Sequence, residues 1–187
     1  MSAEHVDIDS ADSSVIALTR RWVERAVVGL NLCPFARAPF ATERIRYRVS
    51  HATTAQALVD DLVAELQSLQ LSEPEDVETT LLIHPQVLND FLDFNDFLEA
   101  ADATVEGLQL DGLIQVASFH PDYQFEGSAP DDIENYSNRA PYPILHLLRE
   151  ASVERAVELM PDTDQIFERN IETLRNLGPA GWAQLWR

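Results

Sequence analysis

The sequence predicts an α/β fold: a single domain with a mainly parallel sheet, flanking helices and a helical C-terminal part. Three apolar strand segments alternate with two amphipathic helix segments between residues 44 and 119, an order typical of α/β folds. The segments at 80–83 and 113–119 are apolar on both faces, as strands inside parallel sheets are. The chain of 187 residues is long enough for one domain with a sizeable core. An α+β two-layer sandwich with an antiparallel pairing is the alternative fold.

The first element after the N-terminus is predicted to be an amphipathic helix. Residues 1–12 are polar and acidic, so we expect a disordered or frayed tail there, ahead of a single domain at residues 13–187. From Val15 to Leu30, apolar residues recur at three- and four-residue spacing, which predicts a helix that stops near Gly29.

The next five segments form the alternating pattern. Residues 44–51 alternate arginine with apolar side chains and predict a half-buried strand. Thr54 is expected to cap the helix that follows, which has a leucine-rich face. After the short apolar strand, residues 87–104 predict a second helix with an acidic outer face. The third strand, at 113–119, follows an Asp-Gly turn.

The C-terminal part is predicted to consist of a long loop and two helices. Residues 120–143 are rich in turn formers, and loops of this length are usually functional or disordered. Pro143 is expected to open a helix that runs through Ala151. A last helix is expected to be capped near Thr163 or Asp164, and the two tryptophans at the end could dock on the body or on a partner.

Charge and cysteine content limit the class of protein. The formal net charge is −19, and 19 of the 32 acidic residues lie between Val49 and Asn138, where there is no arginine. Such a field repels nucleic acid and anionic lipid. No apolar run reaches the roughly 18–20 residues of a bilayer span, and the acidic start is unlike a secretory signal. Cys33 is the single cysteine. We expect a cytoplasmic protein that binds neither nucleic acid nor membrane.

Three histidines stand where the predicted strands end. His51, His84 and His120 follow the three apolar segments, and a proline follows the second and third of them. The carboxyl ends of parallel strands meet at one edge of a sheet, which is where α/β proteins bind ligands. A residue before proline also favours extended backbone, so each His-Pro pair could simply end a strand. His51 is the least informative of the three.

Two kinds of chemistry could use this edge. His120 is a candidate general acid/base oriented by Asp122, because the pKa of imidazole lies near working pH. Alternatively, His84, His120 and Asp122 offer two imidazoles and a carboxylate, a set that suits a divalent metal with open positions. The spacing matches no established metal motif, and the identity of any cofactor is left open.

Cys33 is a candidate nucleophile. If Pro34 starts a short helix, Cys33 is its N-cap, and the helix dipole would lower the pKa of the thiol. A histidine could complete a Cys-His pair. The alternative is that this cysteine serves as a small apolar side chain in the core.

The loop and the segment after it supply candidate substrate ligands. Asp132, Asn138 and Arg139 lie in the loop, and Arg149 lies on the helix expected to follow. His146, three residues before Arg149 on that helix, is a further candidate catalytic residue. Arg139 and Arg149 follow 90 residues without an arginine, and the planar guanidinium often clamps carboxylate or phosphate. Both arginines could instead hold the loop in place. The partner that these groups suggest is a small anionic molecule.

Common catalytic and nucleotide-binding motifs are absent from the sequence. The 6 glycines form neither GxGxxG nor GxxxxGKS/T, which argues against a nucleotide-binding loop. There is also no GxSxG elbow of the α/β-hydrolase type.

Four blocks of the sequence resemble a known family. They are GLNLCPFA (29–36), ETTLLIHP (78–85), IQVASFHPDYQFEG (114–127) and NRAPYPILHLLREAS (138–152). Together they resemble the bacterial family of unknown function DUF1415, from about Val15 to Leu177. The family pattern implies no activity, has no histidine at position 51, and tends to have a serine in place of Ala140. It matches Trp22, Asn31, Cys33, Pro34, His84, His120, Asp122, Asp132, Asn138, Arg139, Tyr142, His146 and Arg149.

Three functions therefore stay open. The first is an enzyme that acts on a small anionic metabolite by His/Asp acid–base chemistry, or by Cys nucleophilic chemistry, at the carboxyl edge of the sheet. The second is a metal-dependent hydrolase or oxygenase at the same edge. The third is a non-catalytic acidic scaffold or binding protein, motivated by the acidic middle region and the tryptophans at the end.

Overall fold

The computed structural model describes residues 8–158 and 165–187 and contains a four-stranded mixed sheet in those ranges. The strands are β1 (Ile45–Val49), β2 (Thr79–Ile83), β3 (Ile114–Phe119) and β4 (Ile144–Arg149). Their order in the sheet is β1-β2-β4-β3. β1 and β2 pair in parallel, whereas β4 is antiparallel to both of its neighbours. β1, β2 and β3 therefore run in one direction, and the expectation of a mainly parallel sheet is wrong.

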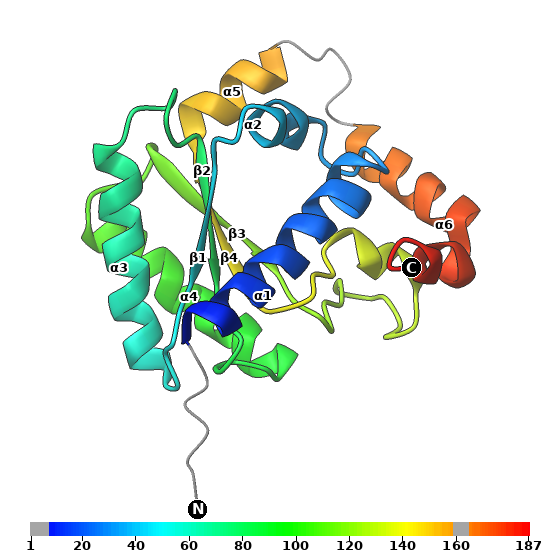
Figure 1. Ribbon diagram of the computed structural model, residues 1–187, viewed down its shortest axis with the longest axis horizontal. Coiled ribbons are helices and arrows are strands. Elements are labelled where there is room, and N and C mark those ends of the chain that lie inside the picture. The colour runs from blue at the N-terminus through cyan, green and yellow to red at the C-terminus, as the bar shows by residue number, and fades with distance from the viewer. Residues whose placement is uncertain (1–7, 159–164) are drawn as a thin grey trace, which may run out of the picture.

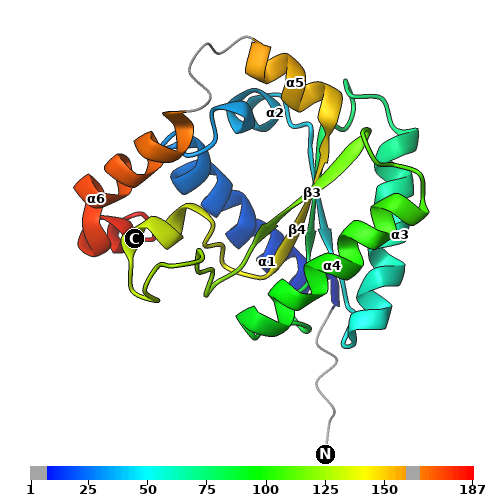
Figure 2. The ribbon, with the colours of Figure 1, turned by 180° about the vertical axis from the view of Figure 1, so that it is seen from behind.

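Helices cover both faces of this sheet (Figures 1 and 2). α3 and α4 lie on one face, and α1 and its π-helical extension η1 lie on the other, with α6 beyond them. α2 and α5 lie at the end of the sheet where β1 and β2 begin and β4 ends (Figure 1). The helices are α1 (Ile8–Trp22), η1 (Val23–Val28), η2 (Pro34–Ala36), α2 (Arg37–Ala41), α3 (Ala55–Leu71), α4 (Phe91–Gly107), η3 (Ile133–Ser137), α5 (Glu150–Glu158) and α6 (Ile166–Gln184).

β4 replaces part of a helix that the sequence predicts. The segment expected to be helical from Pro143 through Ala151 is extended at 144–149, and α5 begins only at Glu150. Every residue of β4 pairs with β2 or β3, so the strand fills the centre of the sheet. The apolar sequence ILHLLR fits a buried helix or a buried strand equally well by periodicity, and the open position between β2 and β3 decides the outcome.

The burial of the strands follows from this order. All five residues of β2 are buried, which confirms that both faces of this strand are covered. β3 is less buried than its sequence suggests, since it lies at the edge of the sheet. Leu82 and Leu147 pack under α3 and α4, whereas Leu81 and Ile144 pack under α1. The sheet thus separates two apolar cores.

Local sequence signals set several helix boundaries. The Thr54 hydroxyl accepts a hydrogen bond from the Ala57 N–H, which confirms the predicted cap of α3. Asp90 caps α4 in the same way. α1 already begins at Ile8, within the stretch expected to be a frayed tail. The cap expected at Thr163 or Asp164 lies outside the described residues.

The tryptophan-rich end packs on the body of the protein. Gly178 has φ 64° and ψ 172°, so it kinks α6 just before Pro179. The segment beyond it turns back, and Trp182 and Trp186 pack against the core beneath α1. Arg25 donates hydrogen bonds to the carbonyl oxygens of Leu185 and Arg187, which holds this segment in place.

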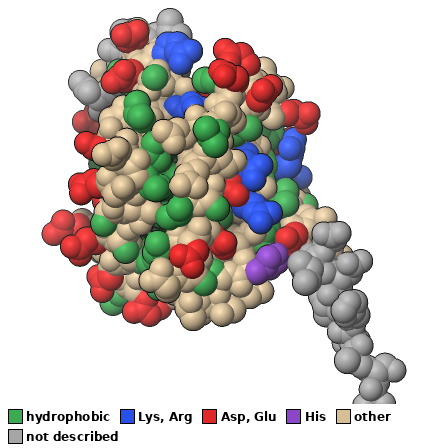
Figure 3. Space-filling view, turned by 90° about the vertical axis from the view of Figure 1, so that its left-hand side faces the viewer, with side chains coloured by type: hydrophobic (Ala, Val, Ile, Leu, Met, Phe, Trp, Pro, Cys, Tyr) green, Lys and Arg blue, Asp and Glu red, His purple; other side chains and the backbone are tan. Residues whose placement is uncertain are grey.

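The surface reflects the charge pattern of the sequence. Acidic side chains are spread over the face in Figure 3, and arginine side chains gather toward one side of it. Two of the arginines of β1, Arg46 and Arg48, form ion pairs with Glu65 of α3. Within the described ranges, every helix is too short or too polar to cross a bilayer.

Candidate functional site

The histidines at the ends of β2 and β3 do lie together. The ring of His84 is 5.6 Å from that of Phe94, centroid to centroid, and the ring of His120 is 5.1 Å from it. His51 follows β1 at the same edge but is exposed, with its Nε2 3.1 Å from the Asp12 carboxylate. The expected convergence of His84 and His120 is therefore confirmed, and it depends only on the shared direction of β2 and β3.

His84 is fully buried and holds the turn after β2. Its Nδ1 is 3.0 Å from the carbonyl oxygen of Val87, so Nδ1 carries the proton and donates it. Its Nε2 is buried and has no partner within the part of the chain that the structure describes. Burial lowers the pKa of this imidazole to about 4, so the ring is neutral at neutral pH.

His120 holds the same turn from β3. The Asp122 N–H donates to its Nδ1 at 3.0 Å, so the proton lies on Nε2, which donates to the carbonyl oxygen of Leu88 at 3.2 Å. Leu88 has φ 57°, a strained conformation for a leucine, and the bonds to the two imidazoles stabilise it. Burial lowers the pKa of His120, although the Leu88 carbonyl and nearby Asp122 and Asp90 oppose this. Both ring nitrogens of His120 thus have backbone partners.

The metal set expected at this edge does not assemble. Asp122 is exposed, and its backbone N–H is the group that contacts His120. Within residues 8–158 and 165–187, no group of three or more His, Cys, Asp or Glu side chains is arranged to hold a metal ion.

The polar residues of the long loop bond within the loop and to the end of β3. The Asp132 carboxylate accepts from the Ala129 N–H, and Asn138 Nδ2 lies 3.4 Å from the Ser118 carbonyl oxygen. Arg139 donates to the carbonyl oxygens of Tyr123 and Pro130. Its guanidinium also lies 4.5 Å from the centroid of the Tyr136 ring. These candidate substrate ligands hold the loop in place.

A cavity of about 570 Å³ opens on the other face and at the other end of the sheet. It lies between the strands and the segments α1–η1, η2–α2 and α5. Its volume is within the roughly 300–1,000 Å³ typical of small-molecule sites. Most of its lining is apolar. The polar side chains are Cys33, Arg44, Glu78, Thr79, Gln115, His146, Arg149, Ser152 and Arg155.

His146 and Thr79 form the polar part of the cavity floor. The Thr79 hydroxyl oxygen is 2.6 Å from the Leu147 carbonyl oxygen and 2.7 Å from His146 Nε2. A carbonyl can only accept, so the hydroxyl hydrogen points to Leu147, and the hydroxyl must accept from His146 Nε2–H. His146 Nδ1 then carries a lone pair. It has no hydrogen-bond partner among the described residues. It is also not one of the side-chain atoms there that are fully buried without a partner.

The environment of His146 keeps its imidazole neutral. Burial lowers its pKa to about 4. The Phe119 ring lies 5.9 Å from the imidazole, centroid to centroid, and Phe119 itself packs edge-on against Trp22 at 5.0 Å. The aromatic side chains fix the orientation of the ring from the deep side of the cavity.

Cys33 lines the same cavity, but not as a thiolate. It is the N-cap residue of η2 with Pro34 in the first turn, as the sequence predicts. Burial nevertheless raises the pKa of the thiol, and the nearby backbone N–H groups of Phe35 and Ala36 offset this only in part. The predicted lowering of the pKa by the helix end is therefore wrong, since desolvation outweighs a single turn of helix.

The wall opposite the sheet is an unusual helix. Residues 23–28 form a π-helix, which is rare in proteins and frequent at functional sites. Val23 and Val27 of this helix line the cavity together with Trp22. The sequence gives no signal for the wider turn.

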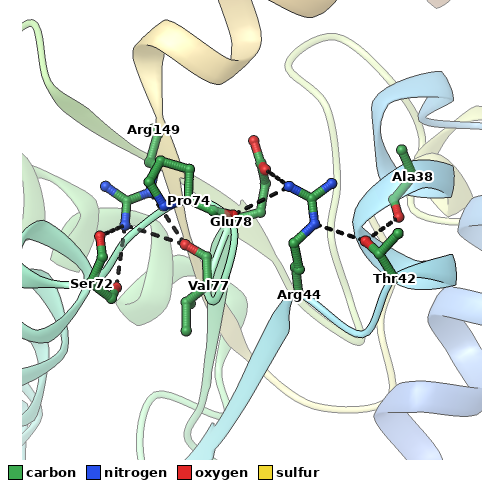
Figure 4. A network of polar contacts seen from close by, with 8 residues as sticks. All are labelled: Ala38, Thr42, Arg44, Ser72, Pro74, Val77, Glu78 and Arg149. Carbon is green, nitrogen blue, oxygen red and sulfur yellow. Dashed lines mark hydrogen bonds and ion pairs between the residues drawn. The ribbon is translucent and has the colours of Figure 1, made fainter.

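Arg149 lines the cavity at the end of β4. Its Nη2 donates to the carbonyl oxygen of Leu69 in α3. Nη2 also donates to the Ser72 carbonyl oxygen, and Nε donates to that of Val77 (Figure 4). Beside it, Arg44 donates to the Glu78 carboxylate at 2.6 Å. The arginine expected to hold substrate thus also secures the end of α3.

The cavity combines only some of the candidate residues. Cys33, His146 and Arg149 line it, whereas His84, His120, Asp122 and the loop residues do not. Sequence reasoning missed Arg44, Glu78, Thr79, Ser152 and Arg155. Arg44 and Glu78 precede β1 and β2, so attention to the starts of the strands, as well as to their ends, could have found them.

Comparison with known proteins identifies the family. A family model described as "Protein of unknown function (DUF1415)" matches residues 14–184, and the chain belongs to this family. Neither the comparison with curated proteins nor that with solved structures found a match.

Proposed function

We propose that this member of the DUF1415 family is an enzyme that binds a small anionic molecule in the cavity between the sheet and α1, α2 and α5. His146 accepts a proton or a hydrogen bond from that molecule through Nδ1. The general acid/base thus moves from His120, whose two nitrogens have backbone partners, to His146, whose Nδ1 has none among the described residues.

One observation carries the proposal: the Thr79 hydroxyl fixes the tautomer of His146. Because Thr79 receives Nε2–H, the lone pair of Nδ1 is available in the cavity. A neutral imidazole oriented by a hydrogen bond on its other nitrogen is the usual form of a histidine base. A proton taken from the substrate would reside on Nδ1, and Thr79 would continue to accept from Nε2–H.

The charge of the ligand matters for this chemistry. In the ligand-free cavity the low pKa makes His146 a weak base. A negative charge nearby favours the imidazolium and raises its pKa. An anionic ligand would therefore strengthen the base that acts on it. Cys33, with its raised pKa, would serve as an apolar wall and weak donor.

The proposal also includes a cellular location for the protein and excludes nucleic acid as its partner. A cytoplasmic location suits a protein with one free thiol, since thiols stay reduced there. The net charge of −19 argues against nucleic acid as the partner. No specific observation favours the metal-dependent alternative. The scaffold alternative loses part of its motivation, because the tryptophans at the end pack on the body.

The test is a search for turnover with a matched control. Wild-type protein, His146→Gln and His51→Gln would each be incubated with a small-metabolite extract, and mass spectrometry would follow every compound. His51 is exposed and lies outside the cavity lining, so its variant controls for loss of an imidazole. We expect a compound that wild type and His51→Gln consume and His146→Gln does not. No consumption by wild type, or equal consumption by all three, would contradict the proposal.

A further inference from the structure

The charge of the cavity lining is opposite to that of the whole protein. The lining contains three arginines, Arg44, Arg149 and Arg155, and one acidic residue, Glu78, a formal charge of +2. The whole chain carries −19. A concave surface of one sign concentrates ligands of the opposite sign. Cation-binding chemistry is therefore disfavoured here even though the protein is strongly acidic.

The arginines of the lining are not fully neutralised by the protein. Arg44 uses Nε on Thr42 and Nη1 on Glu78, and Figure 4 shows its remaining nitrogen on the side of α2. Arg149 donates only to carbonyl oxygens and the Ser72 hydroxyl, and no carboxylate among the described residues pairs with it. Arg155 is exposed and likewise forms no ion pair within the described ranges. Two of the three guanidinium charges of the lining thus have no carboxylate partner among the described residues, which favours an anion from outside.

The register of the sheet orders the lining from charged to apolar. Thr79, Leu148 and Gln115 are paired at the charged end, and Leu81, His146 and Ala117 are paired two residues deeper. Phe119 and Trp22 follow at the deep end. Gln115 and Phe119 lie on the same face of β3, four residues and roughly 13 Å apart. A ligand that extends from the charged end to Phe119 must be elongated, with its charge at one end.

We infer that the cavity binds an elongated monocarboxylate with an apolar body, its carboxylate at Arg155 and the remaining Nη2 of Arg44 and its body beside His146, Trp22 and Phe119. This inference rests on the proposed function and adds the class of ligand. Carboxylate is favoured over phosphate because the lining contains no glycine, so there is no glycine-rich backbone nest of the kind that binds phosphate. The planar guanidinium matches a carboxylate directly.

The test compares head groups on one chain length. Isothermal titration calorimetry would measure octanoate, 1-octanol, octylamine and octyl phosphate against the wild-type protein. Hydrogen bonds between guanidinium and carboxylate are charge-assisted, so octanoate should bind at least about tenfold more tightly than 1-octanol. In Arg155→Gln this difference should shrink several-fold. Arg48→Gln makes the same charge change on the opposite face of the sheet. In this variant the difference in affinity between octanoate and 1-octanol should persist.

The outcomes separate the two proposals. Equal binding of octanoate and 1-octanol would overturn the carboxylate inference and leave an apolar small-molecule cavity standing. Tighter binding of octylamine or octyl phosphate would also overturn it. Binding of none of the four would contradict both this inference and the proposed function. Because Arg155 is exposed, its variant should fold, and circular dichroism would verify that.

Discussion

Thr79 and His146 lie on adjacent antiparallel strands and are joined by a 2.7 Å contact between Oγ1 and Nε2. Thr79 is buried, and its hydroxyl also donates to the Leu147 carbonyl oxygen at 2.6 Å. A hydroxyl with one hydrogen can satisfy both contacts only if the imidazole is the donor in the first. One threonine thus decides which nitrogen of His146 carries the lone pair.

In Thr79→Val, His146 should no longer be held in the Nε2–H tautomer. The imidazole would lose its acceptor, so the Nδ1–H form would gain population, and the nitrogen chemical shifts of the ring would move toward each other in two-dimensional NMR spectra. The free energy of unfolding should fall by about 1–3 kcal/mol, since a buried donor is left without a partner. Thr79→Ser keeps the hydroxyl and should preserve the wild-type shifts. Unchanged shifts in Thr79→Val would show that Thr79 does not set the tautomer.

The stability of the protein should fall as the pH is lowered from about 6.5 toward 4. The pKa of His84 and that of His146 are both lowered from 6.5 to about 4, so the unfolded state binds more protons in this range. Their contribution is therefore complete above pH 6.5 and is lost as the pH falls toward 4. For fully buried His84 the loss amounts to about 3 kcal/mol.

His84→Asn separates this contribution from the general effect of acid. In wild type, His84 Nδ1 donates to the Val87 carbonyl oxygen at 3.0 Å. The asparagine amide can still donate to this oxygen. Urea unfolding at several pH values should show a shallower pH dependence in His84→Asn than in wild type. His51→Asn, at an exposed position, should keep the wild-type slope. An unaltered slope in His84→Asn would remove the buried neutral imidazole as the cause.

Much of the fold was predictable because its signals are local. The Thr54 cap, the buried apolar strand at 79–83 and the His-Pro strand ends each depend on a few neighbouring residues, and all are present in the structure. The segment at 144–149 was not predictable in this way. Pro143 resembles a helix start, and only pairing with two distant strands makes these residues extended.

The candidate site was less predictable because it depends on long-range geometry. The sequence argument followed the carboxyl ends of the strands, where the imidazoles of His84 and His120 bond to Val87 and Leu88 and hold a strained turn. The cavity lies toward the opposite ends of these strands. The end of β4 lines this cavity, and β4 is antiparallel to both of its neighbours. Because the sequence argument predicted a helix at 144–149, it could not place these residues in the cavity.

Arg149→Lys should destabilise the protein although it keeps the charge. The guanidinium bridges the carbonyl oxygens of Leu69, Ser72 and Val77, which requires several donors in a fixed plane. A lysine ammonium cannot reach all three, so we expect a loss of about 1–3 kcal/mol in the free energy of unfolding. Arg155→Lys, at an exposed position on α5, is the matched control and should change stability little. Equal stability of both variants would show that Arg149 does not secure the end of α3.

Asn135 should control the order of the long loop. It is fully buried, and its Oδ1 accepts from the Phe125 N–H at 3.0 Å while its Nδ2 donates to the Ala129 carbonyl oxygen at 2.8 Å. In Asn135→Asp an oxygen would replace Nδ2 and face that carbonyl, adding repulsion and a buried charge. We expect a loss of about 2 kcal/mol or more, and limited proteolysis should cut within residues 120–143.

Asn138→Ala is the control for the Asn135 experiment. Its Nδ2 makes one long contact of 3.4 Å to the Ser118 carbonyl oxygen, so its removal should matter much less. Asn135→Ala is a second test variant, since it adds no charge and should still expose the loop to protease. If the loop resisted cleavage in both Asn135 variants, its order would depend on Arg139, which bonds to Tyr123 and Pro130 from the other side. Arg139→Gln would then show the cleavage that the Asn135 variants lack.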